Sequence, residues 1–198
     1  MIQVTRRWCL LAIAGAPIVL GITAQALSVR VDDHFLRVTA PDLDFLIGGP
    51  LERLKDGKTV PYIAQLSVLS GKERILQGRS IARFAFSYDI WAERYKVTLL
   101  TPLMEHPPTG KNLTRELAQA WCLEQLKIDL ASVPADKPIF VRLEMRSEDP
   151  KDREGIVGQP GISLSAMIAL FSRPVKDKEV HAVREVSLNL ADLRKTRL

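Results

Sequence analysis

Apolar and polar residues alternate most regularly between residues 81 and 99. The apolar members of the alternation are Phe84, Phe86, Tyr88 and Ile90, followed by Tyr95, Val97 and Leu99. A period of two is typical of a strand with one buried face, and the polar interruption at Ala92-Glu93-Arg94 indicates a turn. The segment therefore predicts a β-hairpin, whose five aromatic residues would supply a large share of the core.

The same alternation extends upstream of this hairpin. Residues 62–68 alternate with period two, Ser70-Gly71-Lys72-Glu73 is a turn sequence, and Gly78 indicates a bulge or bend in the strand that follows. Residues 60–101 are thus predicted to form a meander of three or four consecutive antiparallel strands.

Weaker patterns predict the remaining elements. Strands are expected near residues 29–38, 139–145 and 180–190. A short helix with Pro50 in its first turn is expected to end in the turn at residues 55–58. Another short helix is expected at residues 164–171. The predicted fold is therefore one α+β domain, built on a mainly antiparallel β-sheet or sandwich with helices packed on it.

The longest predicted helix spans about residues 113–126, with Asn112 as its cap. One set of its residues follows helical spacing: Leu113, Leu117, Ala120, Trp121 and Glu124. Leu123 and Leu126 lie on a different face, so the helix is either buried on two sides or bent near residue 125.

The first 26 residues have the pattern of a signal peptide. A basic Arg6-Arg7 pair precedes an uncharged apolar run, and Ala24-Gln25-Ala26 is a small-x-small cleavage site. Cleavage would leave a domain of residues 27–198 in the periplasm or outside the cell. The alternative is retention of the run as an inner-membrane anchor, since it is just long enough to span. The arginine pair is also compatible with twin-arginine export.

Charge and cysteine content narrow the function classes. The whole chain carries a net charge of +5, which falls to about +3 once the two leader arginines are removed. This balance argues against a nucleic-acid partner. Cys122 is the only cysteine after the leader, so an internal disulfide is excluded, and its apolar context predicts a buried, inert thiol.

No motif of a known catalytic or cofactor site is present, and no residue is assigned a catalytic, cofactor-binding or metal-binding role. His34, His106 and His181 are the available bases near neutral pH, and His106 is expected to be exposed. Asp89 and Glu93, in and after the aromatic strand, are the carboxylates of first interest, although turn chemistry explains them better.

Two acidic clusters contain residue types that bind metals, but their spacing does not favour a metal site. Asp32-Asp33-His34 would point alternately to opposite faces of a strand. The acids of residues 148–154 lack the order of a calcium-binding loop and alternate with basic residues, so residues 147–161 are predicted to be a mobile surface loop.

Three segments carry a resemblance to a known family: Gly57-Lys58-Thr59-Val60, the run from Phe86 to Trp91 followed by Tyr95-Lys96-Val97, and Leu190-Ala191-Asp192-Leu193. Over residues 45–193 the chain resembles exported proteins of proteobacteria and acidobacteria that share a domain of unknown function. The resemblance implies export and a β-rich domain, and it implies no activity.

The leading functional hypothesis is an exported cell-envelope protein that acts as a non-enzymatic binding or structural module, with an envelope protein or a small ligand as partner. The alternative is a small-ligand carrier or enzyme, with a pocket between the sheet and the predicted helix lined by Phe84, Tyr88 and Trp121.

Overall fold

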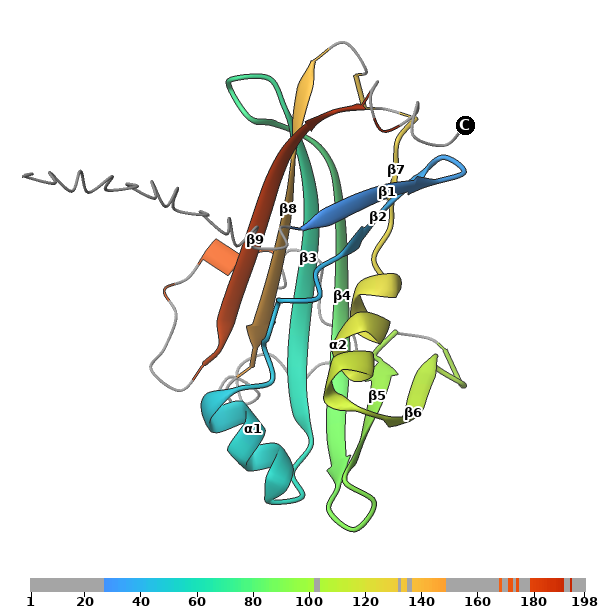
Figure 1. Cartoon of the computed structure of the whole chain (residues 1–198), viewed down its shortest axis with the longest axis vertical. Coiled ribbons are helices and arrows are strands. Elements are labelled where there is room, and N and C mark those ends of the chain that lie inside the picture. The colour runs from blue at the N-terminus through green and yellow to red at the C-terminus, as the bar shows by residue number, and fades with distance from the viewer. Residues whose placement is uncertain are drawn as a thin grey trace, which may run out of the picture.

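The computed structural model describes residues 27–101, 104–131, 133–134, 137–148, 168, 171–172, 174, 179–190 and 193. These residues form two antiparallel sheets and two helices, α1 and α2, which confirms the predicted α+β class (Figure 1). The large sheet has the order β6-β5-β4-β3-β8-β9 and the small sheet the order β1-β2-β7. The elements are β1 Ser28–Asp32, β2 Phe35–Thr39, α1 Gly48–Lys55, β3 Val60–Ser70, β4 Ile75–Asp89, β5 Arg94–Leu99, β6 Thr109–Leu113, α2 Arg115–Glu124, β7 Ile128–Asp129, β8 Pro138–Ser147 and β9 His181–Asn189.

The meander is confirmed and consists of three strands, β3, β4 and β5. Tyr62 lies opposite Phe84, and Phe86 lies opposite Val97, so the predicted aromatic row faces one side of the sheet. Ile90 is an exception to the prediction, because β4 ends at Asp89 and Ile90 is exposed in the turn. The strand ends there because the Asp89 carboxylate accepts hydrogen bonds from the backbone N–H groups of Trp91 and Ala92, which close a turn.

Gly78 marks the predicted bulge. The β3–β4 register shifts where Val68 opposes Gly78 and Leu69 opposes Leu76. The missing side chain also makes room for the small sheet, because a Cβ at position 78 would lie 2.6 Å from Cγ2 of Ile128 in β7. The bulge and the close approach therefore occur at the same residue.

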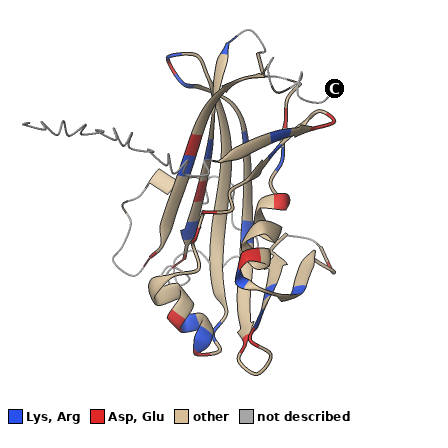
Figure 2. Cartoon of the chain, in the orientation of Figure 1, with Lys and Arg blue, Asp and Glu red and all other residues tan. Residues whose placement is uncertain are grey.

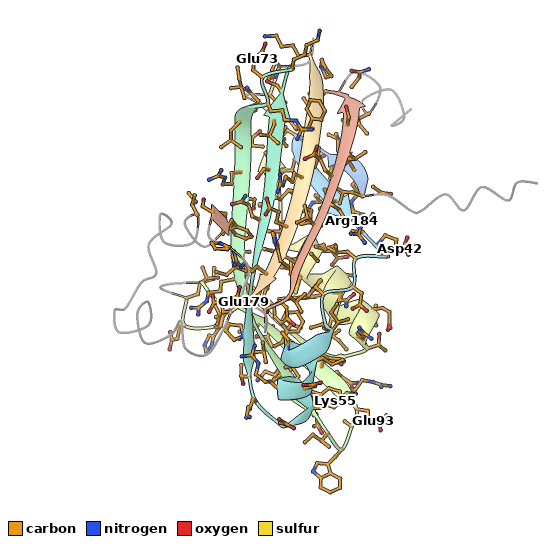
Figure 3. All side chains as sticks on the ribbon, turned by 90° about the vertical axis from the view of Figure 1, so that its left-hand side faces the viewer. Asp42, Lys55, Glu73, Glu93, Glu179 and Arg184 are labelled. Atoms are coloured by element: carbon orange, nitrogen blue, oxygen red, sulfur yellow. The ribbon has the colours of Figure 1, made fainter. Side chains whose placement is uncertain are left out.

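One face of the large sheet carries most of the core. The β1–β2 hairpin, α1 and α2 all lie on this face in two perpendicular views (Figures 1 and 3). Phe45, which follows β2, packs on Tyr62 and Phe86 of the sheet with ring centroids 5.4 and 6.0 Å apart, and the Tyr62 and Phe86 centroids are 5.0 Å from each other. All three rings are fully buried. The sequence indicated the β1–β2 region only as a strand, whereas the structure shows two strands and adds β7 beside β2.

Both predicted helices near residues 50 and 120 exist. Helix α1 contains Pro50 in its first turn and ends as predicted, with Gly57 at φ +75° donating its N–H to Leu54 O. Helix α2 ends at Glu124, so Leu126 lies beyond it and no bend is needed.

The start of α2 corrects two sequence predictions. The cap is Thr114, whose hydroxyl oxygen accepts the Leu117 N–H at 3.3 Å, and Asn112 instead belongs to edge strand β6, which the sequence did not reveal. The buried face of α2 consists of Ala118, Gln119, Cys122 and Leu123. Leu117, expected to pack, is 55% exposed.

Strands β8 and β9 confirm the predictions for residues 139–145 and 180–190. Ser147 and Glu148, predicted in a surface loop, are buried, and the rest of that loop lies outside the described residues. The helix expected at 164–171 also lies largely outside them; of its residues, Ile168 and Phe171 are described and are helical. Residues 1–26 are likewise not described, and none of the helices in the described ranges is long and apolar enough to cross a membrane.

Candidate functional site

The second face of the large sheet carries a row of charged side chains. Along β8, Arg142, Glu144 and Arg146 alternate with the apolar residues of the core face, and Figure 2 shows acidic and basic residues interleaved on β8 and β9. Glu144 contacts Arg142 Nε at 2.8 Å and His181 Nε2, from β9, at 3.1 Å. One carboxylate is thus shared between two possible cations.

Two further ion pairs connect chain segments on this face of the sheet. Arg146 and Glu179, both fully buried, form an ion pair at 2.9 Å, and Arg146 also donates to Pro174 O at 2.8 Å. Arg83 in β4 donates to both carboxylate oxygens of Glu148. Since a buried charge is costly without its partner, these pairs fasten the residues on both sides of the 149–178 segment to the sheet. These ion pairs therefore have a structural role.

The histidines lie on separate elements. His34 occupies the β1–β2 turn with its ring 4.5 Å from that of Phe35, and His106 is exposed in the loop before β6, as predicted. Asp32 pairs with Arg37 at 3.4 Å. In the part of the chain that the structure describes, no three His, Cys, Asp or Glu side chains gather at a possible metal site.

The residues predicted to line a pocket between sheet and helix are all in contact with aromatic rings. Phe84 packs edge-on against Trp121 with 6.2 Å between ring centroids, and Tyr88 packs on Tyr95 at 4.9 Å. Cys122 is fully buried, as predicted, and burial raises the pKa of its thiol well above the usual value.

A groove of about 480 Å³ lies elsewhere on α2, beside the residues that follow β2. Its lining residues are Thr39, Ala40, Pro41, Glu116, Leu117, Gln119, Ala120, Leu123 and Glu124. The Glu116 carboxylate accepts hydrogen bonds from its own backbone N–H and from Thr114, and these bonds lower the pKa of Glu116. The groove is therefore mainly apolar, with an ionised carboxylate at the start of the helix.

Among the residues that the structure describes, the tip of the β4–β5 hairpin carries the most exposed large apolar side chain. The side chain of Trp91 is 97% exposed and that of Ile90 is 54% exposed. Asp89 organises the turn, and Glu93 adopts φ +52° at its end, so both carboxylates of first interest prove to be turn residues. In Figure 3, Glu93 and Lys55 lie at the same end of the molecule.

Both surface features correspond to patterns in the sequence. Trp91 has the opposite parity to the buried aromatic row, which places it outside the core pattern. Glu116, Ala120 and Glu124 recur every four residues, which places two carboxylates and a small residue along one helical line.

No protein-family model, no curated protein and no solved structure matches this chain. The resemblance to exported bacterial proteins consequently remains a prediction from the residues.

Proposed function

We propose that this chain is an exported cell-envelope protein that binds a partner protein through the β4–β5 hairpin tip, and that it acts as a binding module. The observation that carries the proposal is the exposure of Trp91 together with Ile90 at one apex. Single exposed apolar residues are ordinary on protein surfaces. An indole beside a second large apolar side chain is typical of residues that dominate binding energy once buried in a partner.

The tip is held in one shape before any partner arrives. Asp89 Oδ1 accepts two backbone hydrogen bonds, at 2.9 and 3.0 Å, inside the turn. Directly behind it, the Tyr88 and Tyr95 rings pack across the two strands. A preorganised loop loses less conformational entropy on binding, so more of the gain from burying the indole is retained as affinity.

Charge around the tip favours a protein over a lipid surface. Acidic Asp89 and Glu93 flank the apolar residues, and Arg94 donates to the Glu93 carbonyl at 3.2 Å. Anionic membrane surfaces attract basic segments and repel carboxylates. The partner expected is therefore a protein with an apolar pocket for the indole and a basic rim.

Export is supported by the signal-peptide pattern of residues 1–26 and by the resemblance described above. N-terminal sequencing of the protein recovered from the periplasm or medium tests this half of the proposal. A start at Leu27 supports export with cleavage. An uncleaved chain in the membrane fraction would replace it with the anchored alternative.

Binding at the tip is tested with a photo-crosslinking amino acid at Ile90 in the producing cells. One adduct of discrete mass should form, and Trp91→Ala should abolish it. Ile75→Ala is the matched control, because Ile75 is also a half-exposed apolar residue but lies at the opposite end of β4. An adduct that survives Trp91→Ala, or Trp91-dependent binding of the purified protein to phosphatidylglycerol vesicles, would contradict a protein partner.

A further inference from the structure

The groove beside α2 is a second feature with the properties of a binding site, and it is separate from the hairpin tip. Its volume of about 480 Å³ falls within the range of ordinary ligand pockets. One wall is the Thr39-Ala40-Pro41 segment and the other is α2 between Glu116 and Glu124. It is formed entirely by described residues.

The floor of the groove is apolar and partly open to solvent. Leu117 is half-exposed, and Ala120 is exposed beside it. Residues four apart lie in one line along a helix, so Ala120 sits midway between Glu116 and Glu124. Its small side chain leaves a hollow between the two carboxylates, and Pro41 also lines the groove.

The cations beside the two carboxylates of the groove have other partners: Arg37 donates to the Glu124 backbone carbonyl at 2.8 Å and pairs with Asp32 at 3.4 Å. Neither Glu116 nor Glu124 forms an ion pair with any residue in the described ranges. Arg115, the nearest cation in sequence, is paired with Asp44. The glutamates are eight positions apart, which corresponds to about 12 Å along the helix axis.

This spacing matches an extended peptide. A strand rises about 3.3 Å per residue and its side chains alternate, so residues i and i+4 lie on one face about 13 Å apart. Residue i+2 then lies midway on the same face, opposite Ala120. We propose that the groove binds an extended peptide segment with basic residues at i and i+4 and an apolar residue at i+2. The basic side chains pair with Glu116 and Glu124, and the apolar side chain fills the hollow over Ala120.

The proposal is independent of the hairpin tip and of export. The probe is a fluorescein-labelled peptide with the central sequence Lys-Ser-Leu-Ser-Lys, and its binding to the purified protein is measured by fluorescence anisotropy at low salt. Replacing the central leucine by serine, or moving the second lysine one residue closer, should weaken binding at least fivefold. Equal binding of either altered peptide would overturn the proposed recognition.

Two sets of variants locate the site. The double variant Glu116→Gln/Glu124→Gln should bind the peptide about tenfold more weakly, since two exposed ion pairs are lost. Glu52→Gln/Glu73→Gln is the charge-matched control, because both residues are exposed and distant from α2 in sequence, and it should change the affinity less than twofold. An equal loss in both double variants would mean nonspecific attraction and would overturn the proposal.

Ala120→Leu fills the hollow without touching the core, because Ala120 is exposed, and it should also weaken binding. Full competition by octane-1,8-diamine at concentrations equal to those of the peptide would instead assign the groove to a small dication. A dimer in sedimentation that is lost on Ala120→Leu would assign it to a second copy of the chain. Either result overturns the peptide proposal.

Discussion

The contact between Gly78 and Ile128 yields a quantitative test of how the small sheet fits onto the large one. In Gly78→Ala the new Cβ would lie 2.6 Å from Ile128 Cγ2, well inside van der Waals contact. Ile128 cannot easily turn away, because its β-branched side chain has restricted rotamers and its backbone pairs with Leu36. Overpacking of this kind costs about 1–3 kcal/mol.

Part of this cost is offset in the unfolded chain. Gly78 does not adopt a positive φ, so alanine suits its backbone, and the reduced unfolded-state entropy returns about 0.4–1 kcal/mol. We therefore expect Gly78→Ala to lower the free energy of unfolding by about 1–2 kcal/mol, measured by urea denaturation followed by circular dichroism.

A double-mutant cycle isolates the contact. Ile128→Ala removes Cγ2, so Gly78→Ala made in that background should be neutral or slightly stabilising, with a coupling of roughly 1–3 kcal/mol. Gly57→Ala is the control: Gly57 has φ +75° and no atom near its missing Cβ, so its penalty comes from the backbone and should be the same in both backgrounds. If the penalty of Gly78→Ala is unchanged by Ile128→Ala, the close approach of the sheets is not its cause.

Three further predictions concern buried groups. Phe86→Ala should lower the free energy of unfolding by about 3–5 kcal/mol because the ring is fully buried. Glu93→Ala, at the exposed turn, should change it by less than about 0.5 kcal/mol. Equal urea midpoints for the two variants would contradict the assignment of the aromatic row to the core. Burial raises the pKa of Tyr62. The contribution of Tyr62 to the free energy of unfolding is therefore complete below the unfolded tyrosine pKa of about 10 and is lost as pH rises above it. When unfolding is measured between about pH 8 and 12, Tyr62→Phe should lose less stability with rising pH than the unaltered protein. In a Cys9→Ser background, the Cys122 thiol should react with an aromatic disulfide reagent only after unfolding, because it is buried and its pKa is raised. Rapid reaction of the native protein would contradict this and would show that α2 opens.

The local pattern of the sequence predicted most of the sheet. Alternation at Phe84, Phe86 and Tyr95 placed the hairpin and the side that it buries, and Gly78 placed the bulge. These predictions hold because a period of two and a missing side chain act within a few residues. The helix near residue 120 was also located, but its cap and its packed face were misplaced.

The candidate sites depended on contacts that no local pattern contains. Edge strand β6 exists because residues 109–113 pair with β5. Glu148 is buried against Arg83, which lies 65 residues away in sequence and donates hydrogen bonds to its carboxylate. The groove forms where the segment after β2 passes along α2, 75 or more residues later in the chain.

The sequence by itself therefore determined the class of fold, the aromatic core and the expectation of export. Only the tertiary structure decided which charges form buried ion pairs, that Trp91 is exposed at the hairpin tip, and that two glutamates border an open groove. The physical reason is the sequence distance over which each property is determined. Secondary-structure periodicity is set by the backbone over a few residues, whereas burial and pairing are set by whichever distant segment comes to cover a side chain.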